Sequence, residues 1–230
     1  CALPIFELLE AARAHPPAHL LMASTSSVYG ANTEMPFNER MQVETQMSFY
    51  AATKKATESM AHSYAHLYGL PTTMFRFFTV YGPWGRPDMA LFKFTKAMLA
   101  NEPIDVYNHG RMSRDFTYID DLVDGICGLI NAAPTGTPVS KRDSLSPVAP
   151  FRAVNIGANA PTPLMDYIAA IEAALGMLAQ KNMLEMQAGD VPATWADAGL
   201  LQDLTGVRAQ VDVTTGVHRF VEWYRDYYQV

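Results

Sequence analysis

The amino-acid sequence predicts an α/β fold in which helices pack against a mostly parallel sheet. Segments with the apolar spacing of helices alternate along the chain with short apolar runs typical of buried strands. The chain has 230 residues and is 49% hydrophobic, which is enough to bury one good-sized core. Three of the runs have the character of parallel strands, whereas an α/β sheet usually has about five or six strands. We therefore expect the sheet to be incomplete on its N-terminal side.

The N-terminal third of the chain is expected to hold two helices and two strands. Residues 6–14 have helical spacing, and residues 19–23 (HLLMA) form an apolar run typical of a buried strand. Residues 48–68 carry their larger side chains at helical spacing and are followed by a glycine and a proline, the usual residues after the end of a helix. Residues 72–77 then form the second strand.

The rest of the chain is expected to contain short strands between longer helices. A loop over residues 79–88 (TVYGPWGRPD) leads into a helix over 89–100, and short strands over 105–107 and 116–118 flank a turn at Gly110. Further along, the pattern predicts a helix over 119–132, a Pro- and Ser-rich surface loop over 134–150 and a strand over 153–156. Two more helices are expected after it. One runs from an N-cap at Thr162 to about Leu175, and the other is an aromatic-rich helix over 214–228.

The composition of the chain excludes several classes of binding partner. Seventeen basic and 23 acidic residues give a formal net charge of −6, and no run of Lys or Arg suits a nucleic-acid backbone. No apolar stretch approaches the roughly 20 residues that span a bilayer, and no basic leader precedes an apolar region at the start. The two cysteines, Cys1 and Cys127, fit no metal-ligand spacing. We expect a reduced cytoplasmic protein that binds no nucleic acid, no membrane and no metal.

Tyr50 and Lys54, in the sequence YAATK, are the strongest candidates for chemistry. They lie four residues apart on an expected helix, so both side chains project from one face. The strand over 19–23 runs into a hydroxyl cluster that includes Thr25, and ligands of open α/β sheets bind outside the carboxyl ends of strands. A hydroxyl, a phenol and an ammonium are the groups that a redox enzyme needs to take a proton from a sugar alcohol, because a nearby ammonium makes a phenol a stronger acid. The competing interpretations are ordinary packing of a Tyr on a Lys stem and turn-forming hydroxyls after a strand.

Two arginines lie in segments that suit the binding of an anion. Arg86 follows a strand in the Gly- and Pro-rich segment GPWGRPDM, and Arg114 precedes a strand in GRMSRDFTYIDD. Guanidinium groups bind carboxylates and phosphates through two parallel hydrogen bonds, so both residues suit an anionic substrate. The competing interpretation of each arginine is a solvated surface residue.

Taken together, six motifs closely resemble the extended short-chain dehydrogenase/reductase family of nucleotide-sugar epimerases and dehydratases. The motifs are ASTSSVYG, YAATKKATE, RFFTVYGPWGRPDMA, RDFTYIDDLVDG, VNIG and GDVPATWAD. The resemblance runs from about residue 6 to the C-terminus, and within the family it is strongest to the 4-epimerases that act on UDP-glucuronate.

The resemblance implies an NAD(P)-binding Rossmann-like fold that lacks its N-terminal strands and carries a small C-terminal substrate-binding part. The Gly-rich turn that cradles the NAD pyrophosphate in this family has no counterpart in these 230 residues. The implied division is residues 1–80 for the remainder of the Rossmann domain, 81–150 mostly for substrate binding, 151–162 for a returning Rossmann strand, and 163–230 for C-terminal substrate-binding helices. NAD is the implied cofactor, a UDP-sugar the substrate, and a homodimer would form through the helix over 48–68 and the helix before it.

The resemblance also assigns catalytic and cofactor-binding residues. It implies that Tyr50 takes the proton of the C4 hydroxyl as NAD+ accepts the C4 hydride, and that Lys54 binds the nicotinamide ribose and makes the phenol more acidic. Thr25 is expected to hydrogen-bond the reacting hydroxyl, and Ser24 and Phe77 are expected beside the cofactor with Tyr50 and Lys54. The 4-keto sugar then turns over, and the hydride returns to its other face.

For the substrate, the resemblance implies a carboxylate site and a nucleotide site. The residues expected at the C6 carboxylate are Ser26, Ser27, Thr79 and Arg86. Arg114 is expected at the UDP diphosphate, Tyr107 beside the uracil, and Asp190 elsewhere in the substrate site.

Ser26 and Ser27 also separate this chain from other members of the family. The 4,6-dehydratases carry an Asp-Glu pair at these positions and the UDP-glucuronate decarboxylases carry a Glu, whereas neither serine can act as a carboxylic acid. The resemblance therefore favours epimerisation of UDP-glucuronate to UDP-galacturonate. The alternatives are a 4-epimerase of another UDP-hexose, a UDP-glucuronate decarboxylase, and a truncated, non-catalytic fragment that binds a UDP-sugar or dimerises.

Overall fold

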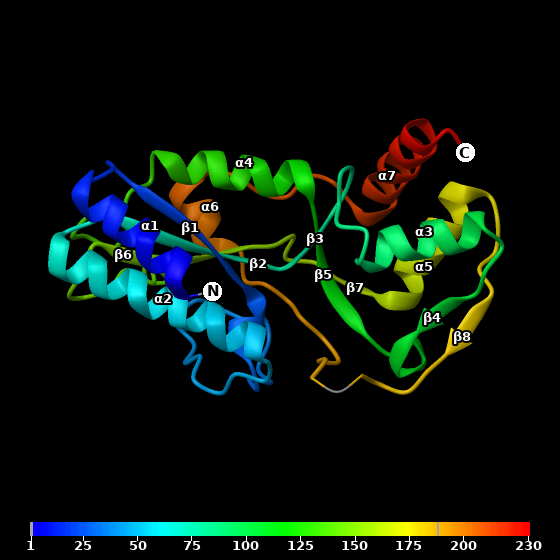
Figure 1. Cartoon of the computed structure of the whole chain (residues 1–230), viewed down its shortest axis with the longest axis horizontal. Coiled ribbons are helices and arrows are strands. Elements are labelled where there is room, and N and C mark those ends of the chain that lie inside the picture. The colour runs from blue at the N-terminus through cyan, green and yellow to red at the C-terminus, as the bar shows by residue number, and fades with distance from the viewer. Residues whose placement is uncertain (1, 188) are drawn as a thin grey trace.

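The computed structural model describes residues 2–187 and 189–230, so Cys1 lies outside the described part. The elements form two groups that lie side by side along the longest axis of the molecule (Figure 1). One group is built around a parallel sheet and contains the N-terminus, and the other contains the C-terminus. Within the described ranges, no helix combines the length and the apolar character needed to cross a membrane.

The sheet of the first group is parallel, as predicted. Its strands, in the order β1-β2-β6, are β1 (Leu20–Thr25), β2 (Thr72–Phe77) and β6 (Phe151–Ile156). Apart from their ends, they are the three parallel strands that the sequence predicts. Pairing in register brings the carboxyl ends Thr25, Phe77 and Ile156 to one edge of the sheet.

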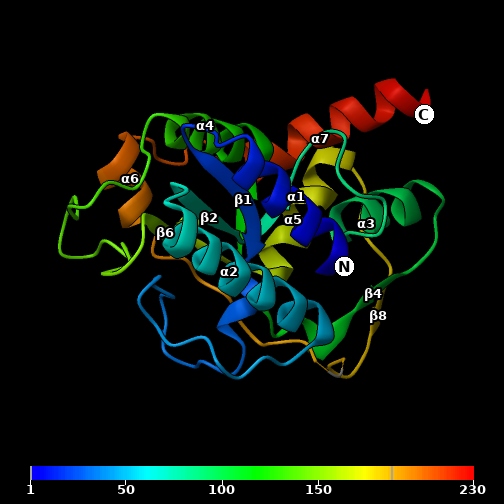
Figure 2. The same cartoon turned by 60° about the vertical axis from the view of Figure 1, so that its left-hand side comes forward.

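Helices cover both faces of this sheet (Figures 1 and 2). The helices on one face are α1 (Ala2–Ala14) and α2 (Phe49–Tyr68), and those on the other are α4 (Ile119–Ile130) and α6 (Gly199–Thr205). Met74 of β2 packs in the apolar cluster beneath the first pair, and its neighbour Phe75 packs in the cluster beneath the second. The alternation of side chains along a strand therefore creates two separate apolar layers.

Helix α2 begins and ends where the sequence predicts. Ser48 is its N-cap, and the Ser48 hydroxyl accepts a hydrogen bond from the N–H of Ala51 at 3.1 Å. Gly69 is its C-cap and adopts a left-handed conformation with a φ of 66°, which a glycine reaches without steric cost. The two caps define the helix that bears Tyr50 and Lys54.

The second group contains two smaller sheets and three helices. Strand β3 (Thr79–Tyr81) pairs in parallel with β5 (Ser113–Tyr118), which pairs antiparallel with β7 (Pro161–Pro163), and β4 (Ile104–Val106) pairs in parallel with β8 (Lys181–Met183). The helices are α3 (Ala90–Leu99), α5 (Leu164–Leu175) and α7 (Val213–Tyr228). Two short 3-10 helices, η1 (Ser26–Tyr29) and η2 (Tyr107–Gly110), follow β1 and β4.

Aromatic side chains dominate the core of this second group. Phe116 of β5 and Tyr167 of α5 stack with their ring centroids 3.8 Å apart and their planes at 2°. The aromatic-rich C-terminal helix is confirmed as α7, and its buried face consists of Gly216, Val217, Phe220, Val221 and Tyr224.

Two expectations for this group are wrong. The segment Thr79–Tyr81, expected in a loop, is a strand, because its main chain pairs with residues 116–118 of β5. Thr162 is not a helix N-cap, because it lies on β7 opposite Arg114, and α5 begins after Pro163 without a side-chain cap. In both cases, pairing with a distant strand determines the conformation of a segment whose own sequence indicates a turn or a cap.

The sequence analysis also missed β7, β8 and α6. They are 3, 3 and 7 residues long, too short for apolar spacing to distinguish them from loops. The two strands exist through their pairing with β5 and β4, which lie far away in the sequence.

The loop over residues 134–150 has no helix or strand, as predicted, but one of its side chains is buried. Asp143 binds Arg152 of β6 through two hydrogen bonds of 2.8 and 2.9 Å, and the two side chains are 0% and 1% exposed. This buried ion pair anchors the loop to the amino end of β6.

Glu39 binds the outer edge of β6. Its Oε1 accepts a hydrogen bond from the N–H of Asn155 at 2.8 Å, and the residue is 7% exposed. Burial raises the pKa of Glu39 to about 7, although the hydrogen bond from Asn155 acts in the opposite direction. The folded chain therefore holds this proton more tightly than the unfolded chain does.

We expect Glu39→Gln to change how the stability of the chain depends on pH. The folded chain loses the Glu39 proton near pH 7, and the unfolded chain loses it near pH 4.5. The contribution of Glu39 to the free energy of unfolding is therefore complete below pH 4.5 and is lost as the pH rises to about 7, a change of about 3 kcal/mol. In urea denaturation, the glutamine variant should lack this loss and exceed the wild type in stability above pH 7. Parallel pH profiles of the two proteins would contradict this expectation.

Candidate active site

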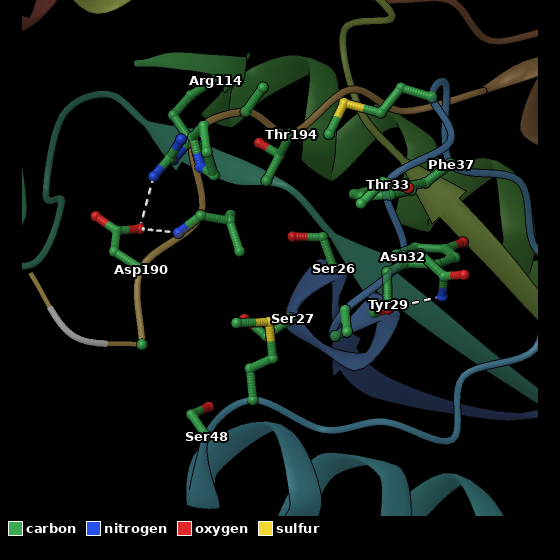
Figure 3. Close-up of a pocket in the computed structure, with 18 of the residues that line it drawn as sticks. Ser26, Ser27, Tyr29, Asn32, Thr33, Phe37, Ser48, Arg114, Asp190 and Thr194 are labelled. Carbon is green, nitrogen blue, oxygen red and sulfur yellow. Dashed lines mark hydrogen bonds and ion pairs between the residues drawn. The ribbon is translucent and has the colours of Figure 1, made fainter. Parts of the chain in front are cut away.

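A cavity of about 670 Å³ lies at the carboxyl end of β1, between η1 and the loop that follows β8 (Figure 3). Five of the residues that the sequence analysis assigns to substrate line it: Ser26, Ser27, Thr79, Arg114 and Asp190. They come from η1, β3, β5 and the loop after β8, so the fold brings together residues that are far apart in the sequence.

Thr25 shapes the hydroxyl end of this cavity. It is the N-cap of η1, and its Oγ1 accepts a hydrogen bond from the N–H of Ser27 at 3.2 Å. The Thr25 hydroxyl also donates to Ser27 Oγ at 3.2 Å. This tight turn places Ser26 and Ser27 in the cavity lining (Figure 3), while Thr25 itself is 8% exposed and lies outside that lining.

Tyr50 and Lys54 lie on α2 beside the carboxyl end of β1. Lys54 Nζ donates a hydrogen bond to the main-chain oxygen of Ala23 at 3.2 Å, and Tyr50 is 54% exposed. Both lie just outside the cavity lining, which reaches α2 at its N-cap, Ser48. The cavity therefore ends at the first turn of the helix that carries the candidate base.

Arg114 and Asp190 form an ion pair at the opposite end of the cavity (Figure 3). Arg114 Nη2 donates to Asp190 Oδ1 at 2.7 Å, and the same oxygen accepts the N–H of Val191 at 2.9 Å. Burial lowers the pKa of Arg114, but a guanidinium stays charged at any ordinary pH. Nearby, the buried hydroxyl oxygen of Thr194 has no hydrogen-bond partner among the described residues. A partly buried cation and a free hydroxyl suit an anionic ligand.

Arg86 lies beside this cavity rather than in it. Its guanidinium binds Asp88 through hydrogen bonds of 3.0 and 2.5 Å, and its side chain is 76% exposed. It shares with Thr79 a second, smaller cavity of about 40 Å³. Arg86 would have to exchange Asp88 for a ligand carboxylate in order to act as predicted.

Three other predicted residues lie away from the cavity. Tyr107 begins η2 and borders a separate depression beside α3. The Ser24 hydroxyl donates to Glu58 Oε1 at 2.6 Å, so its contact with a cofactor would have to come from its main chain. Phe77 packs against Phe75 in the apolar layer beneath α4 and α6, with ring centroids 4.8 Å apart.

Sequence reasoning missed the wall of the cavity that follows η1. Its residues are Tyr29, Gly30, Ala31, Asn32, Thr33, Met35 and Phe37. The Asn32 side chain donates to the main-chain oxygens of Tyr29 and Gln42 at 2.7 and 2.8 Å, which holds this loop in place. The available signal was the position of the loop directly after the hydroxyl cluster, because its residues form no pattern typical of chemistry.

The described residues fit one half of a dinucleotide cofactor. Strand β1 lies at the end of the strand order, and the exposed Tyr50 and the ammonium of Lys54 stand beside its carboxyl end. That arrangement suits a ribose and an aromatic ring, whereas the sequence has no Gly-rich turn to hold a pyrophosphate. Within the part of the chain that the structure describes, no group of His, Cys, Asp and Glu side chains is placed to hold a metal ion.

Comparison with known proteins gives consistent matches. Residues 5–140 match the model of the NAD dependent epimerase/dehydratase family. The chain is 55% identical over 228 residues to a probable UDP-glucuronate 4-epimerase of Rhizobium meliloti (strain 1021), and the match covers 97% of this chain and 67% of the relative. It is 44% identical over 229 residues to UDP-glucuronate 4-epimerase 2 of Arabidopsis thaliana, covering 96% of this chain and 52% of that protein.

The fold is also similar to solved structures of such enzymes. The crystal structure of UDP-glucuronic acid 4-epimerase from Bacillus cereus, in complex with UDP-glucuronic acid and NAD, superimposes with a TM-score of 0.85 at 30% identity. The superposition covers 97% of this chain and 67% of that chain. This chain thus spans about two thirds of the length of these bacterial relatives, as the lack of a Gly-rich turn leads one to expect.

Proposed function

Because this chain belongs to the NAD-dependent epimerase/dehydratase family, we propose that it serves the 4-epimerisation of UDP-glucuronate to UDP-galacturonate, with NAD as cofactor. The observation that carries the proposal is the cavity itself. It joins a cluster of hydroxyls at the carboxyl end of β1 to the guanidinium of Arg114, and it ends at the helix that bears Tyr50 and Lys54. In a sugar acid linked to a diphosphate, the sugar and the phosphates follow one another in the same order as the hydroxyls and the guanidinium that would bind them.

Tyr50 is the proposed catalytic base. Its phenol oxygen takes the proton of the C4 hydroxyl when C4 is oxidised and returns a proton when the 4-keto group is reduced. Lys54 lies one helical turn away on the same face of α2. NAD, when bound, supplies the acceptor and the donor of the C4 hydride, and Lys54 is the residue that would hold its ribose.

The serine and threonine hydroxyls are proposed to bind the sugar. Thr25 hydrogen-bonds the reacting hydroxyl. To do so, its hydroxyl gives up the hydrogen bond to Ser27 Oγ and bonds the sugar instead. Ser26, Ser27 and Thr79, which all line the cavity, hold the C6 carboxylate together with Arg86.

At the nucleotide end, Arg114 is proposed to bind the diphosphate. Asp190 orients Arg114 through their ion pair of 2.7 Å. Tyr107 remains the proposed neighbour of the uracil, although it lies outside the cavity. Such a contact would require the uracil to extend past the cavity toward η2.

The acidic groups of the cavity support epimerisation over related reactions. Among the described lining residues Asp190 is the one carboxylic acid, and it binds Arg114. Dehydration needs an acid beside the sugar to protonate the departing hydroxyl, and Ser26 and Ser27 cannot provide one.

A second candidate function is the 4-epimerisation of a UDP-hexose that has no carboxylate. The observation in its favour is the position of Arg86, which binds Asp88 and leaves the cavity without a second guanidinium. The two functions differ in whether Arg86 contributes to binding.

Catalysis is tested by comparing the 230-residue chain with a fusion to the unmatched part of the Rhizobium meliloti relative. We expect the fusion to contain NAD and to convert UDP-glucuronate, because the fusion adds the part of the relative that this chain does not match. Tyr50→Phe in the fusion should reduce turnover by about 100-fold or more, because the phenol oxygen that carries the proton is lost. Chromatography of the sugar nucleotides measures the conversion by the fusion and by its Tyr50→Phe variant. A fusion that binds NAD and leaves UDP-glucuronate unchanged would contradict the proposed reaction.

Arg86→Ala is expected to weaken binding of UDP-glucuronate by about tenfold and to leave binding of UDP-glucose nearly unchanged, because only the first ligand has a carboxylate. Arg114→Ala is the matched control and should weaken both ligands alike, because both carry the diphosphate. Titration calorimetry on the 230-residue chain measures the four affinities. Equal effects of Arg86→Ala on the two sugars would favour the hexose enzyme.

We also propose that the protein is a cytoplasmic homodimer that associates through α1 and α2. These helices carry several exposed apolar side chains: Phe6, Leu8, Phe49, Leu67 and Tyr68. Exposed apolar groups gathered on adjacent elements are typical of protein interfaces.

Replacing two of these residues tests the dimer. We expect the Leu8→Glu/Leu67→Glu variant to be a monomer by light scattering, because it places charges in the interface. Leu178→Glu, at a leucine that is 84% exposed and lies outside these helices, should leave the dimer intact. A wild-type chain that stays monomeric at all concentrations would rule out this interface.

A further inference from the structure

A row of buried polar residues crosses the sheet of the first group, one residue before its carboxyl edge. Ser24, Arg76 and Asn155 lie side by side on β1, β2 and β6, because the parallel register pairs Ser24 with Arg76 and Arg76 with Asn155. Their exposed fractions are 2%, 3% and 0%. Buried polar groups are costly unless they are bonded, so the partners of this row reveal what it holds in place.

Arg76 joins the two elements that border the cavity. Its Nε and Nη2 donate to the two carboxylate oxygens of Glu58 on α2, both at 2.9 Å. Its Nη1 donates to the hydroxyl of Tyr29, the last residue of η1, at 3.2 Å, and its guanidinium lies 5.0 Å from the Tyr29 ring centroid. One side chain thus contacts both the helix of Tyr50 and the turn of Ser26 and Ser27.

The other members of the row complete the network. The Ser24 hydroxyl donates to Glu58 Oε1 at 2.6 Å, and the Tyr29 hydroxyl donates to Asn155 Oδ1 at 2.7 Å. Burial would raise the pKa of Glu58, but its bonds to Arg76 outweigh this effect and lower it. Glu58 and Arg76 are therefore both charged inside the protein, and the bonds between them at 2.9 Å are much shorter than the 3.7 Å ion pair of Glu58 with the more exposed Lys55.

Small side chains make many of the other buried contacts of α2, beside the hydrogen bond from Lys54 to the main-chain oxygen of Ala23 and the packing of the His62 ring against Phe151. The helix buries Ala51, Ala61 and Ala65, which are 1%, 0% and 0% exposed. Alanine side chains allow a helix to approach a sheet closely, but they do not interdigitate with it and so resist sliding or rotation only weakly. The two parallel bonds between Glu58 and Arg76 have a fixed direction and add a strong restraint between α2 and β2.

We propose that Glu58 and Arg76 are positioning residues, which fix Tyr50 and Lys54 on α2 in register with Ser26 and Ser27 on η1. Glu58 follows Tyr50 and Lys54 at intervals of four residues, so it lies on their side of the helix, about 12 Å from Tyr50 along the axis. The proposal rests on the proposed function for the roles of Tyr50 and Lys54, but the restraint itself is a property of the chain alone.

A matched control lies at the other end of the same sheet. Arg152 and Asp143 form a second buried pair with two parallel hydrogen bonds, and their side chains are 1% and 0% exposed. This pair holds the loop over 134–150, and its own hydrogen bonds in the described structure reach neither α2 nor η1. The loop itself contacts α2 through hydrogen bonds from His62 to Ser146 Oγ at 2.9 Å and from His66 to the main-chain oxygen of Val148 at 2.6 Å, three turns or more beyond Tyr50. Loss of either pair should disturb the fold to a similar extent. Only loss of the pair of Glu58 and Arg76 should also disturb the site.

The test compares two apolar double variants of the 230-residue chain, E58L/R76M and D143L/R152M. Both should stay folded, because well-packed apolar residues often replace a buried ion pair without loss of stability. We expect E58L/R76M to shift the amide NMR signals of Ser26, Ser27 and Tyr50 and to weaken UDP-glucuronate binding by at least about tenfold. D143L/R152M should leave these signals and the affinity close to wild type at a comparable Tm.

The outcomes separate this inference from the proposed function. Unchanged amide signals and affinity in E58L/R76M would overturn the inference, as would equal losses of affinity in the two double variants. A wild-type chain that does not bind UDP-glucuronate would contradict the proposed function, and the amide signals would still decide the inference.

A second variant covers the case in which E58L/R76M does not fold. Arg76→Lys keeps the charge but loses the two parallel bonds. Shifted signals of Tyr50 at an unchanged Tm would then support the proposal, and wild-type signals would overturn it.

Discussion

The parallel register of β1, β2 and β6 determines which side chains meet at each level of the sheet. The side chains of Ser24, Arg76 and Asn155 lie on the face of the sheet that α2 covers. The neighbouring residues Phe75 and Val154 face the apolar layer beneath α4 and α6. A slip of β2 by one residue would turn Arg76 into that apolar layer and leave Glu58 without its partner. The buried charges therefore enforce the register, and the register places the hydroxyl turn after β1 next to the N-terminal turn of α2.

The buried carboxylate of Asp115 performs a similar task for two segments, one of which follows the cavity-lining residue Thr194. Asp115 is 0% exposed, and its two oxygens accept the N–H groups of Ala158 at 2.7 Å and Ala196 at 3.1 Å. Its neighbour Arg114 points the other way, into the cavity, because successive side chains of a strand face opposite sides. The adjacent Arg and Asp of one short motif thus have separate tasks, one toward a ligand and one toward the loops around it.

Local patterns in the sequence predicted the parts of the fold that local forces determine. The bounds of β2 and the end of α2 before Gly69 were predicted correctly, and the start of α2 was predicted to within one residue, because apolar spacing and capping chemistry depend on neighbouring residues. The strand nature of Thr79–Tyr81 and the pairing of Thr162 were not, because each depends on hydrogen bonds to β5. The same limit applies to the site. Hydroxyls and arginines were identifiable by type, but the ion pair of Arg114 with Asp190 joins residues 76 positions apart and has no local signature.

The two arginines differ in how an anionic ligand can reach them. The exposed pair of Arg86 and Asp88, with side chains 76% and 57% exposed, is weakly held, so a ligand carboxylate can replace Asp88 at little cost. Arg114 and Asp190 are 18% and 35% exposed, and Asp190 also fixes its own loop through the N–H of Val191, so displacement of Asp190 by a ligand costs more.

Binding of a ligand to Arg114 does not require displacement of Asp190, however. A guanidinium has five N–H donors, and within the described ranges the hydrogen-bond partners of Arg114 are Asp190 and the main-chain oxygen of Ser113. A phosphate can therefore share Arg114 with Asp190, whereas a carboxylate at Arg86 must exchange with Asp88. Under the proposed function, affinity for the nucleotide would then be built into the folded cavity. Selectivity for the acidic sugar would arise from the difference between the ion pair that lines the cavity and the exposed ion pair beside it.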